Sequence, residues 1–390
     1  MPQFYGKAAI TGMDLISDPD ALYDAFKKAK SGSDWKESVI RYWYGIWWNI
    51  LNTQADLNNG SYRQKDFVEF DISERGKHRH IKSIHISDRV VQRSLCDNVL
   101  MPRTQPLLIY DNGASQENKG IDFTQDRAKR HLHEYHRKYG DNKGFVVTVD
   151  YHNYFGSISH EKLKAAYRKI IPEDDIFRIV CYLIDINDGE YGCGSGAQLS
   201  QNAGIFYRNP VAQYFKTVKG CKFYDVYMDD TLHLCRTRDE AEQFLKEFRE
   251  QSALLELQLS EKKTQIHRLE DGFTFLKVRY VLTETGKVVT HQKNDTFLRE
   301  RRRLKKFKKM GMPGERAADC YRSWRGTVKR FKSNYYRVKR MDALFEELFP
   351  GVEYRTKKEI KNDNQRLCRK QIDKAGRVAE TDGTPDSVER

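Results

Sequence analysis

The pattern of apolar and polar positions changes period along the chain and so separates expected strands from expected helices. Residues 145–149 and 223–234 are runs of β-branched and aromatic residues, which predict strands. Residues 67–72 alternate between apolar and polar side chains and predict one more strand. Asp229 and Asp230 interrupt the run 223–234 at its middle, which predicts a hairpin with these two acids at its turn.

Helical spacing is found towards the two ends of the chain. Between residues 14 and 60, one expected helix face has Leu22, Phe26 and Ala29, and another has Tyr42, Ile46, Trp47 and Ile50. The aromatic cluster from Trp43 to Trp48 is interpreted as core packing rather than a base-stacking platform, because aromatic residues at helical spacing usually fill a core. Ser87 is expected to cap a helix that begins at Asp88. Further helices are predicted for residues 239–257, 315–331 and 334–348.

The composition narrows the class of protein. A net charge of +14 with 12% aromatic residues suits a phosphate backbone with stacked bases, although other basic proteins share such a charge. The seven cysteines include no Cys-x-x-Cys pair, which argues against zinc and for a reducing compartment. No signal peptide and no apolar stretch of about 18 residues is found, so we expect a soluble, cytoplasmic protein without a membrane partner.

Two adjacent carboxylates at a hairpin turn repel each other. An isolated pair such as Asp229 and Asp230 is usually only a polar turn, but a divalent cation would remove the repulsion, because Mg²⁺ prefers carboxylate oxygens. Asp150 ends the run 145–149 and provides a third carboxylate, which a polymerase with two metal ions requires. The three acids together predict nucleotidyl transfer.

Three segments resemble motifs A, B and C of reverse transcriptases, in the order and at the intervals of that family. They are Asp150 with Phe155, residues 196–201, and Tyr227-Met228-Asp229-Asp230. The resemblance extends over about residues 14–290. It is to the bacterial, group II intron-like branch, including the defence-associated unknown-group enzymes and those of diversity-generating retroelements.

The resemblance implies an α+β fold, the right-hand polymerase with fingers, a palm built on an antiparallel sheet, and a helical thumb. The expected segments are an N-terminal helical region 1–65, fingers 66–140, a palm with a fingers insertion 141–290, a thumb 291–350, and a basic, partly disordered tail 351–390. In the thumb, the cations of residues 299–309 are expected to bind the nucleic-acid backbone.

Roles for individual residues also follow from the resemblance. Asp150, Asp229 and Asp230 would bind two Mg²⁺ ions, for which Mn²⁺ can substitute, and Lys263 would protonate the leaving pyrophosphate. Contacts to the incoming deoxynucleotide and the template are expected from Lys77, Arg79, Lys82, Phe155, Gly196, Ser200, Gln201, Tyr227 and Met228. Phe155 would exclude the ribose 2′ hydroxyl, which points to DNA synthesis.

The chain departs from the family pattern at three places. Gln201 follows Ser200 where most relatives have proline, a departure seen in diversity-generating and defence-associated enzymes. Lys277 stands where the primer-grip motif usually has glycine. The loop 110–120 lacks the arginine of the second fingers motif, which leaves Lys119 as the candidate for template or nucleotide contacts.

The expected function is RNA-directed DNA synthesis that copies an associated structured non-coding RNA into cDNA, in antiphage defence. The expected partners are this RNA, the RNA–DNA hybrid, deoxynucleotides, and an oligomeric or accessory protein chain. Three alternatives stay open: the enzyme of a diversity-generating retroelement, a template-independent or protein-primed polymerase, and an RNA-binding scaffold.

Overall fold

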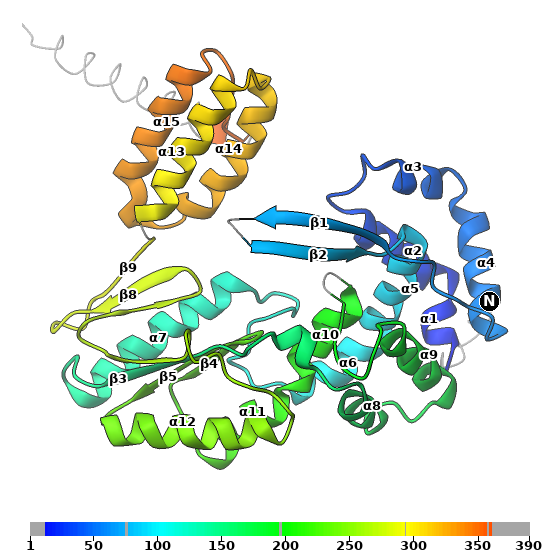
Figure 1. Ribbon diagram of the computed structural model, residues 1–390, viewed down its shortest axis with the longest axis horizontal. Helices are drawn as coiled ribbons and strands as arrows, with labels where there is room; N and C mark the ends of the chain where they lie inside the picture. The colour runs from blue at the N-terminus through cyan, green and yellow to red at the C-terminus, as the bar shows by residue number, and fades with distance from the viewer. Residues whose placement is uncertain (1–11, 75–76, 195–196, 293, 357–358, 361–390) are drawn as a thin grey trace, which may run out of the picture. The chain divides into compact units, whose positions relative to one another are not determined.

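The computed structural model describes residues 12–74, 77–194, 197–292, 294–356 and 359–360 (Figure 1). Gly196, most of the expected tail, and the side chains of Lys77 and Arg79 lie outside the described residues. The chain divides into two compact units, Met1–Leu276 with Tyr280–Val289 and Lys277–Arg279 with Thr290–Arg390. Their helices and antiparallel sheets belong to the expected α+β class. The finer division into fingers, palm and thumb stays a prediction.

Short helices build the N-terminal part of the first unit. They are α1 (Asp14–Ser17), α2 (Pro19–Lys30), α3 (Glu37–Tyr44), α4 (Ile46–Asn58) and α5 (Ile86–Leu95). The carboxylate of Asp18 begins α2 by accepting a hydrogen bond from the Ala21 N–H at 3.0 Å. Leu22, Phe26 and Ala29 are buried, as their spacing predicts.

Most of the aromatic cluster around the junction of α3 and α4 lies on the surface, so its interpretation as core packing is wrong. Trp43, Tyr44, Trp47 and Trp48 are all exposed. Helical spacing indicates that a face is apolar, but it does not say that another part of the same chain covers that face.

A hairpin precedes α5 in the chain. Its strands, β1 (Val68–Glu74) and β2 (Lys77–Ser83), pair antiparallel. Helix α5 begins at Ile86, and the expectation that Ser87 caps it is wrong, because His85 does so. The His85 Nδ1 accepts a hydrogen bond from the Ser87 N–H at 3.2 Å, a role open to an imidazole nitrogen that carries no proton.

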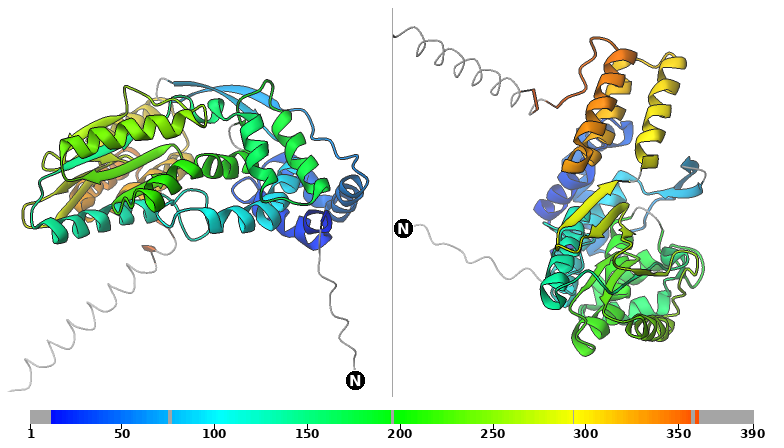
Figure 2. Two further views of the ribbon diagram at one scale, coloured as in Figure 1. Left: turned by 90° about the horizontal axis from the view of Figure 1, so that it is seen from below. Right: turned by 90° about the vertical axis from the view of Figure 1, so that its left-hand side faces the viewer.

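A four-stranded antiparallel sheet forms the centre of the first unit. Its order is β4 (Tyr224–Tyr227), β5 (Asp230–Cys235), β3 (Phe145–Val149) and β6 (Gln265–Arg268). Helices α7 (Ile121–Tyr139) and α12 (Arg238–Ala253) cover opposite faces (Figure 2). His131 of α7 meets Asp225, and Phe244 of α12 meets the adjacent Tyr224, as expected of neighbours in a strand.

The remaining elements of the chain before the second unit's helices connect these parts. They are a π-helical turn Cys96–Leu100, α6 (Met101–Thr104), 3₁₀ turns Gln105–Leu107 and Tyr154–Ser157, α8 (His160–Arg168), α9 (Asp174–Asp185), α10 (Gln198–Tyr207), α11 (Asn209–Gln213) and a π-helical turn Tyr214–Val218. A smaller sheet has the order β7 (Phe273–Phe275), β8 (Val278–Leu282) and β9 (Val288–Gln292).

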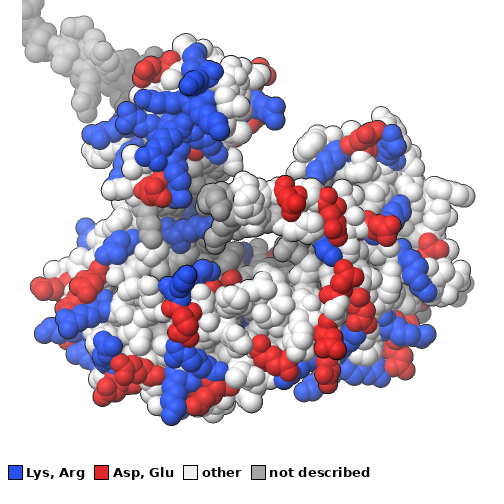
Figure 3. All heavy atoms as spheres, in the orientation of Figure 1, with Lys and Arg blue, Asp and Glu red and all other residues white. Residues whose placement is uncertain are grey.

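The second unit is helical. It contains α13 (Asn294–Lys309), α14 (Gly314–Lys329), a 3₁₀ turn Lys332–Asn334 and α15 (Tyr335–Leu348). Tyr321 of α14 stacks on Phe345 of α15 with ring centroids 4.8 Å apart, and Leu304 of α13 is fully buried. Lys and Arg side chains gather over this unit (Figure 3). Across both units, no helix of the described residues is long and apolar enough to cross a membrane.

Candidate active site

The β4–β5 hairpin presents two acids at its turn, as predicted. Tyr227 pairs with Asp230, so Met228 and Asp229 form a two-residue turn. Met228 has a φ of 52°, in the left-handed region that side chains other than glycine rarely adopt. Such strain persists only where neighbouring groups hold the backbone, and it is frequent at functional sites.

The strand pairing brings Asp150 to the same place. Val149, the last residue of β3, pairs with Thr231 of β5, so the following Asp150 lies alongside Asp230. Lys263 Nζ donates to both carboxylate oxygens of Asp150, at 2.7 and 2.8 Å. The turn that carries this lysine is itself bound to Asp150, because the Ser260 N–H donates to the Asp150 carbonyl at 2.8 Å.

Burial and mutual repulsion make it unfavourable for the three carboxylates to be ionised together. Burial, followed by the neighbouring Asp229 and Asp150, raises the pKa of Asp230 to about 7. Burial and the charge of Asp150 also raise the pKa of Asp229. Lys263 offsets only part of this negative charge. Partly buried carboxylate oxygens with uncompensated charge are a donor set that fits a hard divalent cation.

Arg208 stabilises the acidic turn through hydrogen bonds, and this role was not predicted from the sequence. This fully buried residue joins α10 to α11. Its Nη1 donates to the Met228 carbonyl at 2.7 Å, and its Nη2 donates to the Thr231 hydroxyl at 2.6 Å. Its charge lowers the pKa of both Asp229 and Asp230, against the effect of burial. A lone arginine before Asn209-Pro210 gives no sequence signal of such burial.

Phe155 and the acidic turn both lie close to Gly204 of α10. It belongs to the 3₁₀ turn Tyr154–Ser157, and the Tyr154 hydroxyl donates to the Gly204 carbonyl of α10 at 2.6 Å. A Cβ at Gly204 would lie 2.9 Å from the Phe155 ring and 3.5 Å from the Met228 sulfur. Only glycine lets α10 approach both residues this closely.

The other residues expected in motif B occupy the start of α10. Ser200 is buried, whereas Gln201 is exposed and accepts a hydrogen bond from the Ser115 hydroxyl at 3.3 Å. Tyr227 and Met228 are half-buried and pack beside Ile205.

The two described lysines expected near the nucleotide have protein partners. Lys82 forms ion pairs with Asp188 at 3.3 Å and with Glu69 at 3.4 Å. It lines a cavity of about 20 Å³ together with Ser200, which is room for about one water molecule and not for a nucleotide. Lys119 donates to the Tyr110 carbonyl at 2.8 Å and so holds the backbone of its own loop.

The primer-grip segment forms the β7–β8 turn. Leu276 has a φ of 47° and Lys277 a φ of 66°, so both residues adopt the conformation that glycine favours. Gln125 Nε2 donates to the Leu276 carbonyl at 3.1 Å and stabilises this turn. The turn is therefore built with two left-handed residues that are not glycine.

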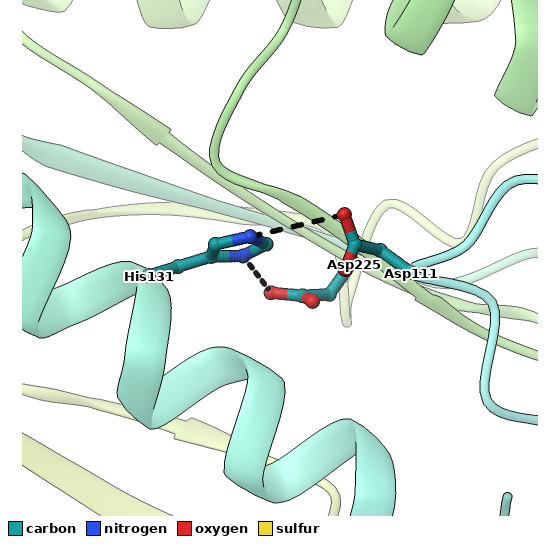
Figure 4. Close-up of side chains that lie close together, drawn as sticks. All are labelled: Asp111, His131 and Asp225. Carbon is teal, nitrogen blue, oxygen red and sulfur yellow. Dashed lines mark hydrogen bonds and ion pairs between the residues drawn. The ribbon is translucent and has the colours of Figure 1, made fainter.

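A second buried acidic group was not predicted. His131 lies between Asp225, with Nδ1 at 2.8 Å from Oδ2, and Asp111, with Nε2 at 3.8 Å from Oδ2 (Figure 4). These residue types could bind a cation. Asp111 is already paired with Arg127 at 2.5 Å and Lys216 at 2.7 Å, so we interpret the group as an internal charge network.

This network connects the 110–113 segment to the β4–β5 hairpin. The Val226 N–H donates to the Asp111 carbonyl at 3.0 Å, and the Gly113 N–H donates to the Val226 carbonyl at 3.1 Å. Because Asp225 and Val226 belong to β4, the network helps to fix the strand that ends at Tyr227.

An antiparallel sheet with acids at a hairpin turn and at the adjoining strand end defines a polymerase of the palm class. Residues 64–282 match the sequence model of the family described as reverse transcriptase (RNA-dependent DNA polymerase). The chain therefore belongs to the reverse transcriptases, and it is an RNA-directed DNA polymerase that uses a nucleic-acid template and deoxynucleotides. Enzymes of this family depend on divalent metal ions. No curated protein matches the chain.

Proposed function

We propose that this reverse transcriptase copies one associated, structured non-coding RNA into DNA as part of a bacterial antiphage defence system. The main support for DNA synthesis at this site is the position of Asp150 beside Asp230, with Asp229 in the adjoining turn. The defence role is supported by resemblance, because Gln201 follows Ser200 as in the defence-associated relatives.

Asp150, Asp229 and Asp230 are proposed to hold two magnesium ions, which when bound would supply the positive charge that nucleotidyl transfer needs at the attacking 3′ hydroxyl and the leaving pyrophosphate. Arg208 fixes the turn on which two of these acids stand, through its hydrogen bonds to the Met228 carbonyl and the Thr231 hydroxyl. The resulting rigidity keeps the carboxylates in position without a cost at the moment of reaction.

Lys263 and Phe155 complete the proposed chemistry. Hydrogen bonds to Asp150 raise the pKa of Lys263 and keep Nζ protonated. Lys263 is proposed to give this proton to the leaving pyrophosphate once the hydrogen bonds to Asp150 are released. The Phe155 ring, which a Cβ at Gly204 would approach to 2.9 Å, is proposed to occupy the space that a ribose 2′ hydroxyl would need. Phe155 is therefore proposed to favour deoxynucleotides over ribonucleotides.

The same Gln201 also favours a second function, that of a diversity-generating retroelement. The two functions differ in their template. A defence enzyme copies a structured RNA encoded beside its gene, whereas a diversity-generating enzyme copies the repeat of a variable target gene with an accessory protein.

The test is to purify the full chain from its native locus, sequence the RNA bound to it, and measure incorporation of labelled deoxynucleotides. Asp229→Ala with Asp230→Ala should abolish magnesium-dependent incorporation, while the exposed Glu250→Ala on α12 should retain it. Equal incorporation by the double variant would contradict the catalytic assignment. If the bound RNA is instead the repeat of a variable target gene, the enzyme belongs to a diversity-generating retroelement and the defence role is contradicted.

A further inference from the structure

Helices α3 and α4 carry an apolar surface that the described part of the chain leaves uncovered. We call it the tryptophan face, and its residues are Ile40, Trp43, Tyr44, Trp47, Trp48 and Leu51. Tyr44 is 84% exposed and Trp48 is 72% exposed, so these large rings meet solvent over most of their area. A patch of this kind commonly marks a binding surface.

The residues of this face are spaced along the sequence as on a helix side that is usually buried. Within each helix its residues recur at intervals of three and four, the pattern of an amphipathic helix. The opposite side already has a full apolar set, because Val39, Tyr42, Ile50 and Leu57 are buried. The two helices therefore have two apolar sides, and only one is covered by described residues.

Two of the exposed rings are held in place by stacking on α2. Trp43 stacks on Phe26 with centroids 5.6 Å apart, and Trp47 stacks on Tyr23 at 5.3 Å. Tyr23 and Phe26 are one turn apart on α2, so the two tryptophans lie next to each other on one support. Ordered rings lose little conformational entropy on binding, which favours association.

The size of the face suits a protein interface. Each aromatic side chain has about 150–250 Å² of surface, so the exposed parts of the four aromatic rings together provide roughly 400–600 Å². A standard interface buries about 800 Å² on each partner, including its polar rim. The tryptophan face can thus form the apolar core of such an interface.

Charge decides between nucleic acid and protein as the occupant. Residues 12–58 contain five Lys and Arg and seven Asp and Glu, whereas the whole chain has a net charge of +14. Lys30 lies over the Trp43 ring at 4.9 Å, but the cations beside the face are paired with acids: Lys30 with Asp34 at 3.6 Å, Lys27 with Asp24 at 2.5 Å and Arg41 with Glu37 at 2.5 Å. The face therefore has no surplus positive charge for a phosphate backbone, and two copies of a strongly basic chain can meet here with little repulsion.

We propose that the tryptophan face binds the same face of a second copy of this chain and makes the protein a two-fold dimer. In a two-fold contact each surface meets itself, so an apolar helix side without net charge is self-complementary. Glu37 and Arg41, which flank the face, pair with each other on α3 at 2.5 Å, and in a two-fold contact each can exchange this partner for the one in the second copy. This inference does not depend on the proposed defence function.

The experiment is multi-angle light scattering of the full chain after nuclease treatment at high salt, at micromolar concentrations. The wild type should have twice the chain mass of 45.9 kDa. Trp48→Glu with Leu51→Glu should raise the dimer dissociation constant at least tenfold and give a monomer. Leu254→Glu, at an exposed leucine outside the face, should remain dimeric.

Two further measurements keep the result decisive. If the glutamate variant fails to fold by circular dichroism, Trp48→Ser with Leu51→Ser replaces it, with the same expected monomer. A wild-type monomer, or a dimer that survives in the folded variant, overturns the proposal. A monomeric wild type whose affinity for single-stranded RNA falls in the variant would show a base-stacking surface instead.

Discussion

At the scale of single residues, a buried guanidinium determines the position of the acidic turn. Replacing Arg208 by Met leaves the Met228 carbonyl and the Thr231 hydroxyl without their donor and removes a charge beside the acids. We expect a loss of about 2–4 kcal/mol in the free energy of unfolding and a large loss of polymerase activity. Urea unfolding and primer extension measure the two effects.

The matched control for this change is Arg238→Met. Arg238 is exposed on α12 and pairs with Glu242 at 2.7 Å, so its loss should change stability by less than about 0.5 kcal/mol. Unchanged stability in Arg208→Met would show that the buried hydrogen bonds contribute little.

The contact between Gly204 and Phe155 is testable by a pair of substitutions. Gly204→Ala places a Cβ 2.9 Å from the Phe155 ring, which should cost about 1–3 kcal/mol and reduce deoxynucleotide incorporation. Adding Phe155→Leu should restore part of the stability, because the smaller side chain relieves the clash, and should increase ribonucleotide incorporation. Additive effects in the double variant would refute direct contact as the cause.

The buried His233 predicts how the free energy of unfolding depends on pH. Burial, more than any other cause, lowers its pKa to about 4, and Lys216 acts in the same direction while Glu240 opposes it. The unfolded chain takes up this proton near pH ~6.5, so stability falls as the pH decreases from ~6.5 to ~4, by roughly 3 kcal/mol.

The measurement is the free energy of unfolding in urea at several pH values. His233→Asn keeps a donor for the Phe223 carbonyl, which His233 Nδ1 contacts at 3.0 Å, and should remove this part of the acid sensitivity. The exposed His133→Asn should leave it unchanged. Equal acid sensitivity in wild type and His233→Asn would contradict the prediction.

At the scale of elements, the β7–β8 turn is built with residues that its backbone disfavours. Lys277 has a φ of 66°, and Lys277→Gly should therefore increase the free energy of unfolding by about 0.5–1 kcal/mol. Lys287→Gly, at a position without positive φ, should decrease it. Thermal unfolding of the two variants gives the comparison, and a destabilised Lys277→Gly would mean that the side chain makes a compensating contact.

Elements with their own local signal could be predicted, and contacts made between distant elements could not. The runs at Phe145–Val149 and around Asp229 carry β-branched residues, a strand-end acid and a turn, so the sequence alone indicates the hairpin and its neighbouring strand. Arg208 and the His131 network depend on burial by distant segments, which no local pattern records. The exposed Trp48 shows the same limit, because periodicity identifies an apolar side but not its partner.

At the scale of the whole molecule, the second unit concentrates positive charge on α13. Arg301, Arg302, Lys305 and Lys306 are exposed, and no acidic partner is found for them among the described residues. Lys305→Gln with Lys306→Gln should weaken binding to an RNA–DNA hybrid and decrease the slope of log affinity against log salt by roughly 1.4–1.8. Fluorescence anisotropy over a range of salt concentrations measures this slope.

The control is Arg299→Gln, because Arg299 already pairs with Asp295 at 3.0 Å and should contribute less to the slope. An unchanged slope in the double lysine variant would place the duplex on another surface.

The absence of space at Gly204 also limits how this enzyme can evolve. A side chain added at position 204 would meet the Phe155 ring or the Met228 sulfur, so we expect substitutions there to reduce activity before they could alter sugar preference. Substitution at Phe155 itself opens space and leaves α10 intact. Under the proposed role of Phe155, the expected first step towards ribonucleotide use is therefore a change at position 155, and a sequence that keeps the Phe155 ring is expected to keep glycine at position 204.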